Sequence, residues 1–313
     1  MRALVTGAAG FIGSTLVEQL LADGADVVGL DCLTDYYPRV LKERNLSAAK
    51  RHPRFRFIQA RIQDADLPSI LADCTHVFHL AAQAGVRKSW GRDFSVYTSN
   101  NVEATQILLE ACVGLPLERM VYSSSSSVYG DDVPLPMRED AVPQPVSPYG
   151  VTKLAAEHLC YLYHVNEGVP VVSLRYFTVY GPRQRPDMGF HKFLRATLLD
   201  QPITVYGDGE QTRDFTFVHD VVAANAAAAK QGVVGRVYNI GGGSRVSVNE
   251  VLDMIARVSG RRPNVIVDPA QKGDMRHTCA DTSLARADLG FIPRVGLEEG
   301  LAAEHAWLTE ILS

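Results

Sequence analysis

The feature that most constrains this chain is the glycine-rich segment near its N-terminus, Thr6-Gly-Ala-Ala-Gly-Phe-Ile-Gly13. It lies between a short apolar run and an amphipathic stretch, which places it between a predicted strand and a predicted helix. Glycines permit a tight turn and a close approach of backbone to pyrophosphate, and the helix N-terminus offers unpaired N–H groups to the phosphates. The segment therefore predicts a dinucleotide-binding turn. The residues expected to contact the cofactor are Gly7, Gly10, Phe11, Ile12 and Gly13.

An acidic residue, Asp31, closes the second apolar run of the chain. In dinucleotide-binding sheets a carboxylate at this place accepts hydrogen bonds from the hydroxyls of the adenosine ribose. The same carboxylate repels a 2′-phosphate, so Asp31 favours NAD over NADP as the cofactor.

Short apolar runs alternate with amphipathic stretches through the first half of the chain. The runs are nearly continuous in apolarity, as expected for strands that are buried on both faces. They are Ala3–Thr6, Val27–Leu30, Phe55–Ile58, His76–Ala82, Met120–Ser123 and Val171–Leu174. The stretches Phe11–Leu21, Val102–Cys112 and Tyr149–Tyr163 predict helices. This alternation predicts an α/β fold, a Rossmann-type doubly wound parallel sheet with helices on both faces.

The pattern changes in the last third of the chain, where a smaller C-terminal α/β lobe for the substrate is expected. Phe177–Met188 holds two prolines and predicts a loop. Ser247-Val-Asn-Glu250 has the pattern of a capping box, which opens a helix. Phe190–Leu199 predicts a further helix, and Ile203–Tyr206 and Val237–Ile240 predict strands. The expected division is residues 1–176 and 204–240 for the NAD-binding Rossmann domain, and residues 177–203 and 241–313 for the substrate-binding lobe.

Tyr149 and Lys153 stand four residues apart at the start of a predicted helix, so they share one face. A free tyrosine has a pKa of about 10 and is a poor base at neutral pH. We expect the nearby ammonium to lower that pKa, so that Tyr149 takes a proton from a hydroxyl as hydride leaves its carbon. Five serines, Ser123–Ser127, follow a predicted strand at the edge where α/β sheets bind ligands. Among them Ser125 is the candidate to hydrogen-bond the reacting oxygen.

These segments resemble the extended short-chain dehydrogenase/reductase family, and the resemblance covers nearly the whole chain. Further segments that fit are Arg213-Asp-Phe-Thr-Phe-Val-His-Asp220, Tyr238-Asn-Ile-Gly-Gly-Gly243 and Gly273-Asp274. The resemblance implies a Rossmann lobe that binds NAD, a second lobe that binds a nucleoside diphosphate sugar, and a triad that maps onto Ser125, Tyr149 and Lys153. It also implies a homodimer in which the helices at Val102–Cys112 and Tyr149–Tyr163 pair as a four-helix bundle.

Three reactions of this family begin with the same oxidation of the sugar at C4, and the residues before Val128-Tyr-Gly130 distinguish them. A 4,6-dehydratase typically carries Asp-Glu there, and a UDP-glucuronate decarboxylase carries glutamate. This chain carries Ser126-Ser127. A 4-epimerase needs no further acid, because the ketone turns and takes the hydride back on its other face. The resemblance therefore favours epimerisation.

Two segments resemble those of UDP-glucuronate 4-epimerases within the family, His79–Arg87 and Arg175–Met188, and Asp35-Tyr-Tyr37 with Lys42 also fits. A 4-keto uronate is a β-keto acid and loses carbon dioxide when its carboxylate stands perpendicular to the carbonyl plane. We expect hydroxyls of Ser126, Ser127 and Thr178 to hold the carboxylate away from that orientation, and Arg213 to bind the pyrophosphate. The remaining substrate candidates are Arg87, Arg185, Tyr206 and Arg276.

The adenine end departs from the family pattern. Arg61 stands where the family usually has an aspartate that contacts the adenine amino group. The backbone of Ile62 and the side chain of Asp64 are the remaining candidates to hold the adenine, and Ala81 is a further cofactor contact expected from the resemblance.

Composition limits the partners. The net charge is −4 without a long basic run, which excludes nucleic acid and an anionic membrane surface as expected partners. No apolar run approaches the length of a membrane span, and the N-terminus lacks the pattern of a signal peptide, so a cytoplasmic protein is expected. The five cysteines are scattered and predict neither disulfides nor a metal site. They are Cys32, Cys74, Cys112, Cys160 and Cys279.

Four alternatives stay open at this point. A UDP-glucose 4-epimerase, a UDP-N-acetylglucosamine 4-epimerase and a UDP-glucuronate decarboxylase share the chemistry of the leading hypothesis. A catalytically inactive NAD-binding regulatory module belongs to a different class, because a fold does not fix a function.

Overall fold

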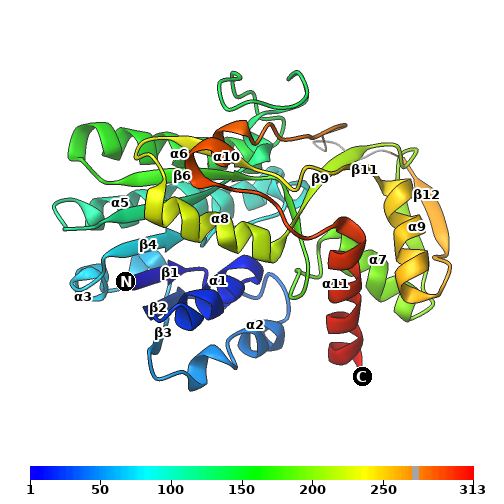
Figure 1. Ribbon diagram of the computed structural model, residues 1–313, viewed down its shortest axis with the longest axis horizontal. Coiled ribbons are helices and arrows are strands. Elements are labelled where there is room, and N and C mark those ends of the chain that lie inside the picture. The colour runs from blue at the N-terminus through cyan, green and yellow to red at the C-terminus, as the bar shows by residue number, and fades with distance from the viewer. Residues whose placement is uncertain (270–274) are drawn as a thin grey trace.

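The computed structural model describes residues 1–269 and 275–313 of the chain. Its centre is a seven-stranded parallel sheet. In spatial order the strands are β10 (Val237–Ile240), β6 (Val171–Tyr176), β5 (Arg119–Ser125), β4 (His76–His79), β1 (Arg2–Thr6), β2 (Asp26–Asp31) and β3 (Phe55–Gln59). The chain runs outward from β1 to β3 and then returns to β4 on the other side of β1 (Figure 1). Ligands bind at such a reversal of strand order, outside the carboxyl ends of the strands.

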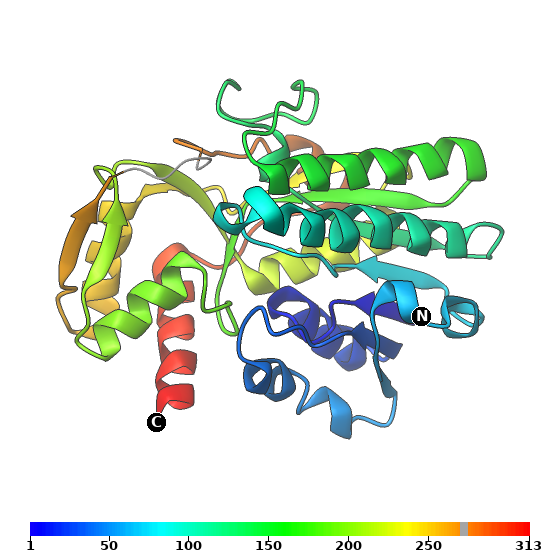
Figure 2. The same cartoon turned by 180° about the vertical axis from the view of Figure 1, so that it is seen from behind.

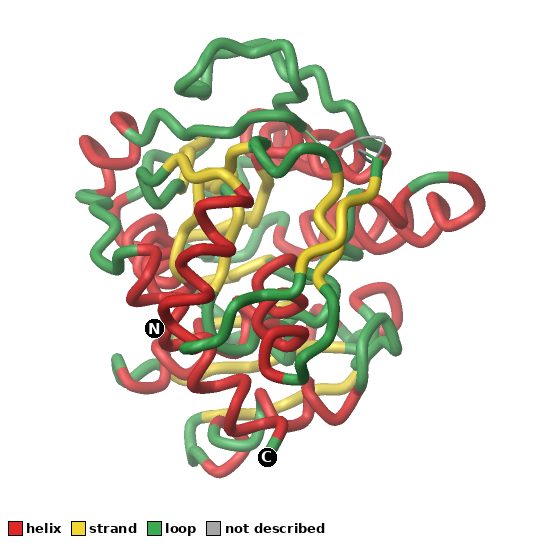
Figure 3. The backbone as a smooth tube through the Cα atoms, turned by 90° about the vertical axis from the view of Figure 1, so that its right-hand side faces the viewer, coloured by secondary structure: helices red, strands yellow, loops and turns green. Residues whose placement is uncertain are grey.

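Helices cover both faces of this sheet. On one face lie α1 (Phe11–Ala22), α8 (Val218–Gln231) and α10 (Ser283–Leu289), and on the other lie α3 (Leu67–Leu71), α5 (Ala104–Cys112) and α6 (Pro148–Glu167). Side chains of β5 alternate between them: Val121 packs with α1 and α8, whereas Met120 and Tyr122 pack with α5 and α6. Figure 2 shows α5 and α6 side by side, and in Figure 3 the strands form a layer between helices. The predicted Rossmann-type α/β fold is confirmed.

A smaller lobe lies beside the carboxyl end of the sheet (Figure 1). It contains a three-stranded sheet of β7 (Thr178–Tyr180), β9 (Thr212–Phe217) and β11 (Arg245–Ser247), and a parallel pair of β8 (Ile203–Tyr206) and β12 (Val265–Asp268). Its helices are α7 (Gly189–Leu198), α9 (Val248–Ser259) and α11 (Leu297–Leu312). Leu194, Val251, Ile255 and Leu301 are fully buried between them.

Most predicted elements are confirmed, with three corrections. The strand predicted at His76–Ala82 ends at His79, because the chain then turns over the end of β1, where the N–H of Ala81 donates to Thr6 Oγ1. The loop predicted at Phe177–Met188 begins with β7, which pairs with β9 and buries Val179 and Tyr180. The helix predicted at Val102–Cys112 is α5 preceded by a π-helical segment, Thr98–Glu103.

The chain passes between the two lobes more often than the predicted domain boundaries imply. Within 204–240, α8 and β10 belong to the large sheet, whereas β8 and β9 pair with strands of the lobe. Within 241–313, α10 packs against α8 and β10. The division into domains stays a prediction.

The capping box predicted at Ser247 is confirmed. Ser247 Oγ accepts the N–H of Glu250 at 3.2 Å, and Glu250 Oε2 accepts the N–H of Ser247 at 2.7 Å. Because the N–H of Glu250 at the α9 N-terminus loses its partner, we expect Ser247→Ala to lower the free energy of unfolding by about 1 kcal/mol. Urea denaturation followed by circular dichroism measures this difference. Ser313→Ala at the exposed C-terminus is the control, and equal stability of the two variants would contradict the prediction.

Candidate active site

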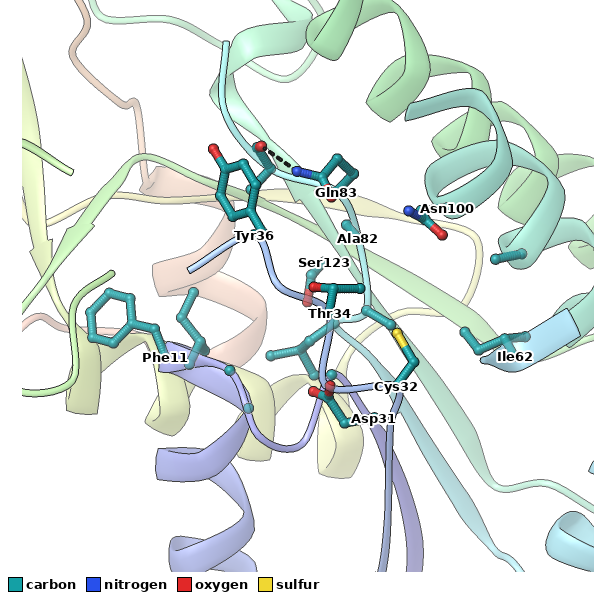
Figure 4. Close-up of a pocket in the computed structure, with 18 of the residues that line it drawn as sticks. Phe11, Asp31, Cys32, Thr34, Tyr36, Ile62, Ala82, Gln83, Asn100 and Ser123 are labelled. Atoms are coloured by element: carbon teal, nitrogen blue, oxygen red, sulfur yellow. Dashed lines mark hydrogen bonds between the residues drawn. The ribbon is translucent and has the colours of Figure 1, made fainter. Parts of the chain in front are cut away.

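A cavity lies at the carboxyl edge of the large sheet, where the strand order reverses. Its walls come from the glycine turn after β1, from the ends of β2 and β3, and from the segment after β4. Figure 4 shows Phe11 at one end of this cavity and Ile62 and Asn100 at the other. Tyr149, Lys153 and Arg185 also line it. We refer to it as the cofactor cavity.

The glycine turn has the shape that a pyrophosphate requires. Gly7 has a φ of +71°, and a Cβ on it would lie 2.8 Å from the backbone nitrogen of Ala81. A Cβ on Gly13 would overlap the carbonyl oxygen of Gly7. Gly10 precedes α1, and no side chain of the described residues caps this helix, so its first N–H groups are available to an anion. All five predicted residues of the turn line the cavity and fit the phosphates of NAD.

Asp31 lies at the end of β2 and lines the cavity, as its predicted role requires. Its carboxylate accepts the N–H groups of Ala9 at 3.0 Å and Leu33 at 2.8 Å. A carboxylate has about four acceptor positions, so ribose hydroxyls can donate to it as well.

The adenine end of the cavity differs from the family pattern, as the sequence indicated. Ile62 and Ala81 line the cavity, and so does Arg61, whose guanidinium donates to Ser99 Oγ at 3.2 Å. Asp64 is not among the described residues that line it. The structure therefore brings Ile62, but not Asp64, to the expected position.

The N-terminus of α6 packs directly on the turn that follows β5, Ser126–Val128, which we refer to as the serine turn. Ser147 caps the helix by accepting the N–H of Gly150 at 3.1 Å, and Pro148 occupies its first turn. A Cβ on Gly150 would overlap the carbonyl oxygen of Ser127, so only glycine permits this approach. The contact places Tyr149 against the serines, and Ser125 forms a hydrogen bond with it.

Burial controls the proton affinities of the triad. It raises the pKa of Tyr149 above its ordinary value, and the Ser125 hydrogen bond and the Arg185 charge offset only part of this effect. The prediction that the protein's own cation brings the Tyr149 pKa below its ordinary value is therefore wrong, because desolvation of the phenolate outweighs the attraction. Burial also lowers the pKa of Lys153, to about 8. The Lys153 ammonium lies over the Tyr122 ring, 4.5 Å from its centroid.

A second cavity adjoins the serine turn and brings four of the predicted substrate residues together. They are Ser126, Ser127, Thr178 and Arg213. The guanidinium of Arg213 donates to the carbonyl oxygens of Thr212 at 2.9 Å and Arg276 at 3.2 Å. We refer to this space as the sugar cavity.

Arg185 is held in the cofactor cavity beside Tyr149, not on the surface. It donates to both carboxylate oxygens of Asp187 at 3.0 Å, and the Tyr36 hydroxyl donates to the same carboxylate at 3.2 Å. Its positive charge lowers the pKa of Tyr149, which shows that the two groups interact.

The other three substrate candidates, Arg87, Tyr206 and Arg276, are not among the described residues that line the sugar cavity. The Arg87 guanidinium stacks on the Tyr206 ring, 4.4 Å from its centroid, and so joins the large lobe to the small one. Arg276 is half-exposed and pairs with Asp208 at 2.7 Å. The predicted segment Gly273-Asp274 lies outside the described residues.

Two residues near the triad were missed by the sequence analysis. Asn101, in the π-helical segment, donates to Thr152 Oγ1 at 2.9 Å and to the Gln83 carbonyl at 3.0 Å, which ties α6 to the segment after β4. Glu157 is buried on the face of α6 that carries Lys153. Its position four residues after Lys153 was the available signal.

No group of three His, Cys, Asp or Glu residues suited to a metal ion occurs in the described part of the chain. Of the helices it contains, none has the length and apolarity that crossing a membrane requires.

Comparisons with known proteins agree with this geometry. The YtcB protein of Bacillus subtilis (strain 168), named an uncharacterized UDP-glucose epimerase, is 44% identical over 99% of each chain. A UDP-glucuronate 4-epimerase of Thermodesulfobacterium geofontis is 37% identical, over 98% of this chain and 96% of its own. The crystal structure of UDP-glucuronic acid 4-epimerase from Bacillus cereus, in complex with UDP-glucuronic acid and NAD, superposes with a TM-score of 0.97 at 45% identity, covering 99% of this chain and 100% of that one.

A family model also matches residues 3–241, a range that includes the glycine turn, Asp31 and the triad. The chain belongs to the NAD-dependent epimerase/dehydratase family.

Proposed function

We propose that this protein is an NAD-dependent 4-epimerase that interconverts UDP-glucuronate and UDP-galacturonate. One observation carries the proposal: Tyr149 and its partner Ser125 stand where the cofactor cavity and the serine turn of the sugar cavity meet. A sugar held in the second cavity thereby presents a hydroxyl to Tyr149. The similarity to UDP-glucuronate 4-epimerases over nearly the full chain supports this choice of substrate.

The cofactor cavity fits NAD through the glycine turn and Asp31. When bound, NAD accepts a hydride from the sugar and returns it, and its oxidised ring adds positive charge beside Tyr149. The protein's part is to hold the dinucleotide with its nicotinamide end toward α6 and to move one proton.

Tyr149 takes the proton of the C4 hydroxyl as hydride leaves C4, which gives a 4-keto sugar. Ser125 donates to the reacting oxygen, and Lys153 stabilises the phenolate by its charge. The ketone then turns so that its other face receives the hydride, and Tyr149 returns the proton to the oxygen. Atoms and electrons balance without a further oxidant.

The residues of the serine turn argue against the two alternative reactions, 4,6-dehydration and decarboxylation. Elimination of water from C5 and C6 requires an acid and a base, and Ser126 and Ser127 supply neither at neutral pH. Their hydroxyls and that of Thr178 instead suit hydrogen bonds to a carboxylate. This arrangement favours the uronate substrate over UDP-glucose and UDP-N-acetylglucosamine, and it favours epimerisation over decarboxylation.

A homodimer completes the proposal. Four apolar side chains on one helix, α6, stay exposed in the single chain, which suits a face that a second copy covers. They are Val151, Tyr161, Leu162 and Val165, with exposures of 47%, 59%, 51% and 59%. With α5 alongside, two copies would form a four-helix bundle.

The reaction is tested by incubating the protein with UDP-glucuronate and following the products by proton NMR. We expect UDP-galacturonate without net NADH. Tyr149→Phe should lower kcat about 10²- to 10⁴-fold, the usual contribution of general acid–base catalysis, while NAD still binds. Tyr163→Phe is the control, because its hydroxyl bonds to Gln106 and Glu110 and it is not among the described residues that line the cofactor cavity. Full activity of Tyr149→Phe would exclude the mechanism, and turnover of neither UDP-glucuronate nor the neutral UDP-sugars would favour the regulatory module.

Thr178→Val tests the restraint on the carboxylate. The lost hydroxyl should let the 4-keto uronate reach the orientation that releases carbon dioxide, and raise the share of decarboxylated product about tenfold, as expected for one lost hydrogen bond. Thr309→Val, on exposed α11, serves as the control. NMR quantifies the product ratio, and an unchanged ratio would count against a role for Thr178.

The dimer face is tested by Val165→Glu, which places a charge in the proposed apolar contact. We expect analytical ultracentrifugation to show a dimer for the unmodified protein and a monomer for this variant. Val267→Glu is the matched control, because Val267 is also exposed, at 71%, but lies on β12 in the other lobe. A monomeric unmodified protein would refute the arrangement.

A further inference from the structure

Glu157 is a buried carboxylate on the catalytic helix to which the reaction described above assigns no role. Tyr149, Lys153 and Glu157 follow one another at intervals of four residues, so they share one face of α6. Glu157 is 5% exposed. A charge is buried at considerable cost unless it is paired, so its contacts indicate what it does.

Its two carboxylate oxygens are bonded to groups from two strands of the large sheet. Ser124 Oγ, on β5, donates to Oε2 at 2.6 Å. Arg175, on β6, donates through Nη2 to Oε1 at 2.6 Å and through Nε to Oε2 at 3.1 Å. Ser124 itself lines the cofactor cavity, so Glu157 reaches that cavity through one hydrogen bond.

Lys153 depends on the charges around it, because it is buried. Among the described residues, the titratable groups that interact with it are Glu157 and Cys160 on α6, Tyr122 on β5 and His79 on β4. Tyr149 lies one turn earlier on the same face of α6, and burial raises its pKa, so it is neutral in the resting protein. Burial raises the pKa of Cys160 and of Tyr122 and lowers that of His79 to about 3, so these three are neutral at neutral pH. The negative charge that remains beside Lys153 is that of Glu157.

Arg175 keeps this negative charge in place. A lone buried carboxylate next to an ammonium would take its proton, and both charges would vanish. The two bonds from Arg175 instead give the Glu157 carboxylate a bidentate, buried counter-ion. The side chains of Arg175 and Glu157 are only 5% and 6% exposed, so water screens their interaction little.

We propose that Glu157 is a positioning residue, which keeps Lys153 in its ammonium form and holds Ser124 at the wall of the cofactor cavity, with Arg175 as its counter-ion. The proposal rests on the proposed function, because it assigns Lys153 the task of stabilising the Tyr149 phenolate. It adds a fourth member to the triad, acting through Lys153 rather than on the substrate.

The pH dependence of kcat/KM tests it. Glu157→Gln removes the charge and keeps one acceptor oxygen for part of the hydrogen bonds from Ser124 and Arg175, with an amide NH2 in place of the other oxygen. Without that charge the ammonium is less stable, so the pKa of Lys153 falls and activity is lost at a lower pH. We expect the alkaline limb to move down by about one pH unit, a tenfold change in proton affinity. In Glu157→Asp, which keeps the charge, the alkaline limb should lie close to its native pH. Glu167→Gln, at the exposed end of the same helix, should not shift it.

A titration of Lys153 gives a readout that does not depend on turnover. Carbon-13 NMR of protein labelled at the lysine ε-carbons follows each ammonium, and the Lys153 signal is the one missing from Lys153→Arg. The midpoint should fall in Glu157→Gln and stay near the native value in Glu157→Asp.

The possible outcomes separate the two proposals. Suppose that Glu157→Gln folds, its activity is lowered equally at every pH, and neither the alkaline limb nor the Lys153 midpoint moves. Glu157 would then have only a structural role, and the proposal would be wrong. Absence of turnover in the unmodified protein would refute the proposed reaction, while the Lys153 midpoints would still decide the role of Glu157. Circular dichroism of each variant verifies folding. If Glu157→Gln does not fold, the double variant Glu157→Gln/Arg175→Gln replaces it, because it removes the Glu157 charge without leaving Arg175 unpaired in the interior.

Discussion

The site depends on one steric contact, the packing of the α6 N-terminus on the serine turn after β5. Gly150 lies so close to the Ser127 carbonyl that a Cβ would overlap it, and the Ser147 cap fixes the direction in which the helix starts. The residue before Gly150 is Tyr149, which is thereby pressed against Ser125. From this contact the helix runs back along the sheet and carries Lys153 at the wall of the cofactor cavity. A helix started one residue later would point a different face at the cavity.

That placement has an electrostatic consequence, because a helix packed so closely takes its charged residues out of water. Burial raises the pKa of Tyr149 and lowers that of Lys153, so each group is pushed toward its neutral form. The catalytic step requires both ionised forms. Charges from outside the triad offset part of the penalty: Arg185, on the loop after β7, acts on Tyr149, and Glu157, on α6 itself, acts on Lys153. The triad is thus sustained by residues from outside its own motif, in a site where low polarity strengthens each interaction.

The sequence predicted those parts of the site that follow from local spacing. The glycine turn, Asp31, the i to i+4 pair of Tyr149 and Lys153, and the Ser247 capping box each depend on a few neighbouring residues. What it missed depends on tertiary contacts. Burial reversed the direction expected for the Tyr149 pKa, and pairing with a distant strand turned part of a predicted loop into β7. Arg185 and Arg276 look alike as loop arginines, yet one lies in the cofactor cavity beside Tyr149 and the other pairs with Asp208 near solvent. Local sequence does not carry that difference.

The neutral character of the serine turn links the fold to the proposed chemistry. An ionised glutamate in place of Ser127 would stand in the sugar cavity and repel a uronate carboxylate, whereas a hydroxyl donates a hydrogen bond to it. Epimerisation also requires the 4-keto sugar to turn between the two hydride transfers, so its ring must be held loosely while its ends are held firmly. A cavity lined both by neutral hydroxyls and by Arg213 suits that division in the proposed reaction, because an arginine would bind phosphate strongly, whereas hydroxyls form weaker bonds that can exchange as the ring turns.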